Sequence, residues 1–95
     1  MSIRNKTYKD YGMNNDDVKA TLNKVLVLNN EQREKIKELF SEHIPQELIE
    51  YVCMSVFDGV IYKKLCAQGL DYDQIDFAAY KRVAVWLAYN YLSEI

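Results

Sequence analysis

The chain has 95 residues, of which 49% are hydrophobic and 27% are charged, and its formal net charge is −2. This composition is typical of a globular protein and excludes a disordered one, and the length suits one domain, residues 1–95, with a modest core. The small negative charge excludes a general attraction to nucleic acid or to an anionic membrane. Neither a membrane span nor an apolar secretory signal is found, so we expect a cytoplasmic protein that does not bind a membrane.

The first 13 residues form a polar arm that carries three basic residues before its first acid, Asp10. The basic residues are Arg4, Lys6 and Lys9. One interpretation of the arm is a partly disordered terminus. The other is a basic arm that reaches a DNA groove or a partner. In either case three apolar or aromatic side chains are available to hold it to the body of the protein: Tyr8, Tyr11 and Met13.

Two helices with apolar stripes are predicted after the arm. Asn14 or Asn15 is expected to cap the first, whose stripe is Val18, Leu22, Val25 and Leu26. The second extends from about Glu31 to Glu42, and its apolar face is Ile36, Leu39 and Phe40. Its charged residues, Arg33 among them, predict a solvated face with no functional role. The short apolar run 25–28 is interpreted as helical, because helical spacing precedes it.

A third helix is predicted from Pro45 to about Phe57, since proline suits the first position of a helix. Gly59 is expected to end it in the left-handed conformation. A short helix then covers residues 60–67 and ends at Gly69.

The last helix, from Tyr72 to Ser93, is the most apolar and contains no glycine or proline. Every residue from 83 to 89 is apolar or aromatic, so this helix must be packed on several sides. We therefore predict an all-α fold, a compact bundle of four to five helices around the C-terminal helix, with Trp86 buried at the centre. Asp71 or Asp73 is expected to cap it. We expect the exposed C-terminal end of this helix to promote homodimer formation through Tyr89, Tyr91 and Ile95.

No residue pattern predicts an enzyme. The only histidine, His43, has no nucleophile that the sequence places beside it, and the three glycines form no phosphate-binding loop. An acidic cluster lacks the glycine and distal glutamate of a calcium loop: Asp71, Asp73 and Asp76. We expect no catalytic residue, metal, cofactor or small-molecule substrate. Cys53 and Cys66 are interpreted as reduced, buried thiols, with a disulfide between them as the alternative.

Residues 57–65 read Phe-Asp-Gly-Val-Ile-Tyr-Lys-Lys-Leu, and a turn at Gly69 and a long helix follow. This pattern resembles the helix-turn-helix of sigma-factor domain four and of related phage regulators, over about residues 57–87. Further similarity is to small accessory proteins of conjugative elements and phages of Gram-positive bacteria, carried by Tyr11-Gly12-Met13, Asp76-Phe77, Tyr80 and Arg82. Ile61 departs from the sigma-type motif, which usually has a small hydroxyl residue there.

The resemblance implies a small DNA-binding or transcription-associated regulator of a mobile genetic element. The residues expected to contact DNA are Arg4, Lys6, Lys9, Lys63, Lys64, Gln74, Lys81 and Arg82. Local charge opposes this interpretation, because carboxylates that face phosphates repel them. From Glu47 to Ile95 the chain has seven acids and four bases, a net charge of −3.

The alternative is a protein-binding inhibitor whose carboxylates imitate phosphates. Its partner would be a host nucleic-acid-binding defence protein, for example a CRISPR effector. The binding surface would be acidic and rich in tyrosine, formed by Asp71, Tyr72, Asp73, Asp76, Tyr89 and Tyr91.

Overall fold

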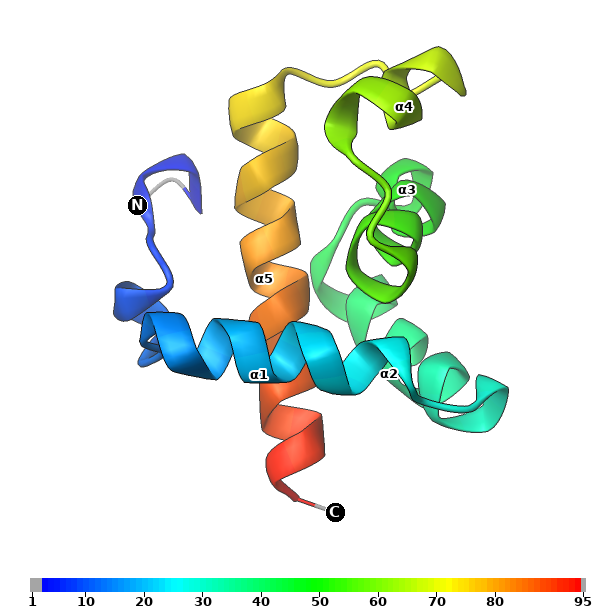
Figure 1. The fold of residues 1–95 in the computed structure, drawn as a ribbon. Coiled ribbons are helices and arrows are strands. Elements are labelled where there is room, and N and C mark those ends of the chain that lie inside the picture. Colours follow the sequence, from blue (N-terminus) through cyan, green and yellow to red (C-terminus); the bar gives the residue numbers. More distant parts are fainter. Residues whose placement is uncertain (1–2, 95) are drawn as a thin grey trace.

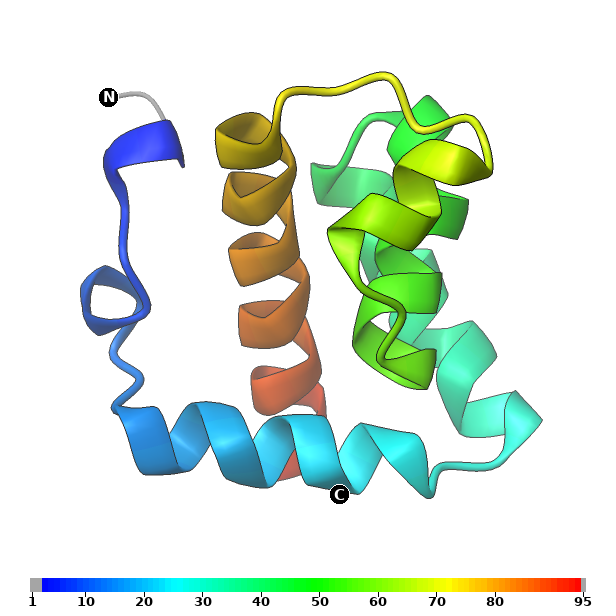
Figure 2. The same cartoon turned by 45° about the horizontal axis from the view of Figure 1, so that its top comes forward.

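The computed structural model describes residues 3–94, and within that range the chain forms helices and no strand. The elements in order are the 3-10 helices η1 (Ile3–Asn5) and η2 (Lys9–Tyr11), then α1 (Asn15–Leu26), α2 (Asn30–His43), α3 (Gln46–Asp58), α4 (Tyr62–Ala67) and α5 (Gln74–Ser93). The arm lies along one side of α5, α3 and α4 lie on the other side, and α1 crosses the second half of α5 (Figures 1 and 2). The predicted all-α bundle around a long C-terminal helix is therefore confirmed. No helix in residues 3–94 is long and apolar enough to cross a bilayer.

Reciprocal capping boxes begin α1 and α2. At α1 the Asn14 side chain accepts the Asp17 N–H at 2.8 Å, and the Asp17 carboxylate accepts the Asn14 N–H at 3.0 Å. Asn29 and Gln32 repeat the arrangement at α2, at 2.9 and 3.2 Å. Each box satisfies backbone donors that have no partner inside the helix, which explains why these helices begin where the sequence predicts.

The core lies between α3, α5 and the helices that cover them. Its fully buried side chains come from five helices and are Val25, Ile36, Phe40, Leu48, Val52, Leu65, Ala84, Val85 and Ala88. The prediction for Trp86 is wrong, because its side chain is only half-buried and packs 5.3 Å from the Tyr11 ring of the arm. The small residues Ala84 and Ala88 occupy the centre instead, since they allow neighbouring helices to approach α5 closely.

The arm is held against α5 by the three side chains that the sequence suggested. Met13 is 2% exposed, and Tyr8 and Tyr11 are half-buried against the core. Burial raises the pKa of Tyr8 and of Tyr11, and the nearby charge of Arg82 partly offsets that rise. The described part of the arm, residues 3–13, is thus packed on the body of the protein.

The sequence analysis placed Arg33 on a solvated face, and this prediction is wrong. Only 25% of the Arg33 side chain is exposed. Its guanidinium donates to the carbonyl oxygens of Leu26 at 3.1 Å and Phe57 at 3.3 Å, and reaches the Asp58 carboxylate at 3.2 Å. Leu26 and Asp58 are the last residues of α1 and α3, where the carbonyl ends of both helices carry partial negative charge. Arg33 therefore joins the C-terminal ends of two helices.

The apolar stripe of α1 also differs from the prediction at its end. Leu26 is 50% exposed, whereas Thr21, which the stripe omitted, is buried and donates its hydroxyl to the Asp17 carbonyl at 2.8 Å. That hydrogen bond satisfies the hydroxyl inside the helix, so a threonine is tolerated against α5.

Candidate nucleic-acid interface

The residues predicted to bind DNA come from three segments that surround the first half of α5. Both ribbon views place this half between the arm and α4 (Figures 1 and 2). The arm supplies Arg4, Lys6 and Lys9, α4 supplies Lys63 and Lys64, and α5 supplies Gln74, Lys81 and Arg82. The fold thus brings these segments into one region of the molecule, although 59 positions separate Arg4 from Lys63.

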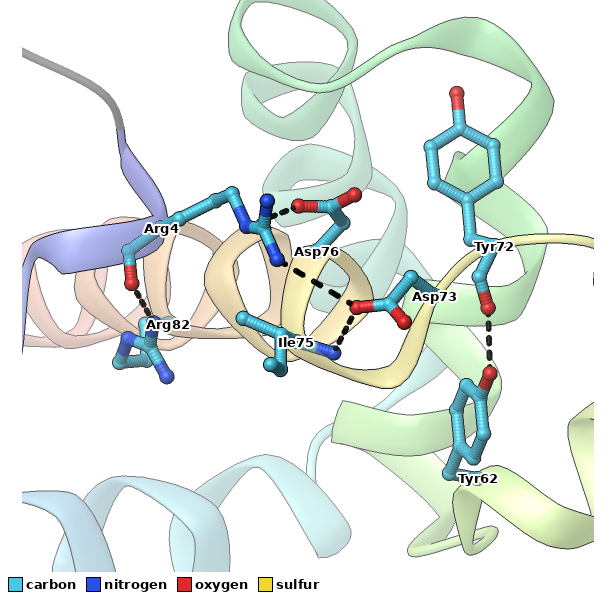
Figure 3. A network of polar contacts seen from close by, with 7 residues as sticks. All are labelled: Arg4, Tyr62, Tyr72, Asp73, Ile75, Asp76 and Arg82. Carbon is cyan, nitrogen blue, oxygen red and sulfur yellow. Dashed lines mark hydrogen bonds and ion pairs between the residues drawn. The ribbon is translucent and has the colours of Figure 1, made fainter.

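The acidic cluster at the start of α5 is paired with the arm. Arg4 Nε lies 2.8 Å from the Asp76 carboxylate, and the same guanidinium lies 3.9 Å from Asp73 (Figure 3). Asp73 also caps α5, since its carboxylate accepts the Ile75 N–H at 3.0 Å. Each ion pair is largely exposed and individually weak. Together they neutralise part of the negative charge that opposed DNA binding.

Helix geometry separates the remaining Asp76 charge from one strip of α5, Gln74, Ile75, Ala78, Lys81 and Arg82. We call it the exposed strip because Gln74 and Ile75 are exposed at its start, while its other three residues are half-buried. Successive residues of an α-helix are about 100° apart around its axis. Gln74, Lys81 and Arg82 therefore lie about 120–160° from Asp76. A polyanion on the exposed strip would not face the Asp76 carboxylate, so the repulsion that the sequence suggested is reduced.

Two cationic side chains, Lys6 and Arg82, make contacts where the arm meets α5. The Lys6 ammonium lies 5.2 Å from the centre of the Tyr11 ring, within the range of a cation–π contact. The Arg82 guanidinium donates to the Arg4 carbonyl oxygen at 3.4 Å (Figure 3). These contacts hold positive charge beside the exposed strip. A sequence pattern could not find them, because Arg4 and Arg82 are 78 positions apart.

On its other side the exposed strip borders a groove of about 290 Å³ between the start of α4 and α5. The groove is lined by Ser55, Gly59, Val60, Ile61, Tyr62, Gln74, Phe77, Ala78 and Lys81. Lys81 is half-buried there, and desolvation lowers the pKa of its ammonium. The sequence analysis missed this groove because three separate segments form it.

The tyrosine-rich alternative surface is divided by the fold. Tyr72 reaches α3, where its hydroxyl donates to Glu47 at 2.8 Å. Its carbonyl accepts from the Tyr62 hydroxyl (Figure 3). Tyr89 and Tyr91 lie at the other end of α5, about 24 Å along the helix from Asp73. They are half-buried rather than exposed, and Ile95 lies outside the described residues. The six proposed residues therefore do not form one continuous surface, and homodimer formation stays a prediction.

The two cysteines are free thiols in different surroundings. Cys53 is half-buried, and burial raises its pKa to about 11. Cys66 is exposed, contrary to the prediction of a buried thiol, because only Leu65 of the short α4 points fully into the core. The alternative of a disulfide between them is not realised in the structure.

We expect iodoacetamide at neutral pH to alkylate Cys66 at least about tenfold faster than Cys53, since only the thiolate reacts and a pKa near 11 leaves little of it. Mass spectrometry of a time course measures both rates, and Cys66→Ser should leave only the slow reaction. Equal rates in the wild-type protein would contradict the burial of Cys53.

No group of three or more histidine, cysteine, aspartate or glutamate side chains within residues 3–94 is placed to hold a metal ion. No protein-family model, no curated protein and no solved structure matches this chain.

Proposed function

We propose that this protein binds duplex DNA through the exposed strip of α5, as a small regulator of a mobile genetic element. The observation that supports this most is the pairing of Arg4 with Asp73 and Asp76, at 3.9 and 2.8 Å. The pairing offsets part of the negative charge that opposes DNA binding, and it holds the basic arm beside the helix that would enter the DNA groove.

The side chains of the strip are chemically suited to this role. Lys81 and Arg82 are cations that can donate to phosphate oxygens, and Gln74 in the first turn of α5 can recognise an adenine edge through two hydrogen bonds. Lys6 and Lys9 belong to the arm, and Lys63 and Lys64 belong to α4, the two segments on either side of this half of α5. In this proposal they contact the phosphate backbone on either side of the DNA groove. Without the flanking cations a chain with a net charge of −2 would have little affinity for DNA.

The proposal predicts that a fluorescent duplex is bound with a dissociation constant in the micromolar range at about 50 mM salt, because non-specific affinities are typically 10⁻⁴–10⁻⁶ M at physiological salt and tighten as salt falls. Fluorescence anisotropy measures this directly. No binding at tens of micromolar protein would contradict the proposal.

Charge variants locate the interface. Lys6→Ala and Lys63→Ala should each lower the slope of log affinity against log salt by about 0.9, since each removes one phosphate contact. Lys35→Ala is the matched control, because Lys35 lies on α2 and faces Glu31 at 3.9 Å. An equal decrease of this slope in Lys35→Ala would mean that binding depends on the total charge of the protein and not on the α5 face. Gln74→Ala should instead reduce the preference between sequences and leave the salt slope unchanged.

A further inference from the structure

The groove between α4 and α5 has mainly apolar walls and a partly open mouth. Phe77 is 3% exposed and forms its floor, while Val60 and Ala78 are half-buried. Ile61 stands at the rim and is 59% exposed. A volume of about 290 Å³ is at the small end of ligand sites, so it suits one or two side chains of a partner better than a cofactor.

Ile61 occupies a position at which its own chain gains little from isoleucine. It is the N-cap of α4, and its side chain makes no capping hydrogen bond. Serine, threonine, aspartate or asparagine would stabilise the helix there, whereas isoleucine is among the least favourable residues at an N-cap. The sequence thus places a large apolar side chain on the surface where a small polar one would favour folding.

The charges around the groove leave one cation available to a ligand. The Lys81 ammonium has no hydrogen bond or ion pair within residues 3–94. Three acids lie next to the groove-lining segments along the chain. Asp58 pairs with Arg33 at 3.2 Å, and Asp73 and Asp76 share Arg4 at 3.9 and 2.8 Å. An incoming carboxylate would therefore meet an uncompensated ammonium beside an apolar surface.

We propose that this groove binds an acidic amphipathic segment of a protein partner. A large apolar side chain of the segment enters between Ile61 and Phe77, and a neighbouring aspartate or glutamate pairs with Lys81. In this proposal the Ile61 side chain serves the partner contact rather than the cap of α4. Lys81 and Gln74 belong to both the groove and the DNA interface. Ile61 is not among the residues assigned to DNA, so Ile61→Ser is the variant that separates the two proposals.

A random-peptide library displayed on phage and selected against the full chain supplies the probe. We expect enriched peptides to carry an acidic residue next to a large apolar one. Fluorescence anisotropy of a synthetic enriched peptide should show a loss of affinity of at least about tenfold in Ile61→Ser and in Lys81→Gln. In Ile61→Ser the melting temperature should rise by about 4–8 °C, because the new serine caps α4. Lys35→Ala is the control and should bind the peptide as the wild type does.

Three results would each overturn the proposal. The first is a selection that enriches no acidic-apolar sequence. The second is a peptide that binds Ile61→Ser and Lys81→Gln as well as it binds the wild type. The third is an Ile61→Ser variant that melts at a lower temperature, since isoleucine would then serve the fold itself. Duplex DNA measured in parallel should bind Ile61→Ser unchanged, so a failure of the groove is distinguished from a failure of the DNA interface.

Discussion

Replacing Arg33 with alanine is expected to lower the free energy of unfolding by about 2–4 kcal/mol, because a hydrogen-bonded charge that is mostly buried would be removed from between two helices. The guanidinium contacts the carbonyls of Leu26 and Phe57 and the Asp58 carboxylate, and its carbon lies 5.4 Å from the centre of the Phe57 ring. Truncation would leave these acceptors at the negative ends of α1 and α3 without their cation. Urea denaturation followed by circular dichroism measures the change.

Two further variants make this result specific. Arg33→Lys keeps the charge but cannot donate to several acceptors at once, so it should recover only part of the loss. Lys35→Ala removes a cation from the same helix, but its pair with Glu31 is exposed and 3.9 Å long, so the loss should stay below about 0.5 kcal/mol. An Arg33→Ala loss below about 1 kcal/mol would mean that water replaces the guanidinium at these carbonyls.

Phe40→Ala is expected to have the largest effect on stability, a loss of about 3–5 kcal/mol, because it leaves a cavity in the centre of the core. The Phe40 ring is fully buried and stacks on Phe57 with the ring centres 5.8 Å apart. Trp86→Ala should lower the free energy of unfolding by at least about 1 kcal/mol less than Phe40→Ala does. Tryptophan is larger than phenylalanine, but the Trp86 ring is only half-buried against the arm.

Urea denaturation of both variants checks this order. The Trp86 variant should also show faster hydrogen exchange in the arm, since it loses the contact with Tyr11, whereas exchange in α2 should stay unchanged. A greater loss for Trp86→Ala than for Phe40→Ala would restore the interpretation in which Trp86 is the centre of the core.

The sequence by itself determined the helices, most of their ends and the central place of the last helix. Asn14, Gly59 and Asp73 stand at helix ends as predicted, because capping depends on residues within three or four positions. The apolar run 83–89 required packing on several sides whatever the neighbours were. The wrong prediction for Trp86 came from the same apolar run. Hydrophobicity indicates that a helix is buried, but it does not indicate which of its faces points to the centre of the core.

Only the tertiary structure decided how the charged residues are used. Arg33 and Asp58 are 25 positions apart, and Arg4 and Asp76 are 72 positions apart. The groove at Ile61 likewise exists only where α3, α4 and α5 meet. A long charged side chain that looks solvated in a helical pattern takes its partner from whichever helix end or loop the packing brings near it. Helix formation depends on local sequence, whereas these contacts depend on the angles at which helices pack, which no local pattern encodes.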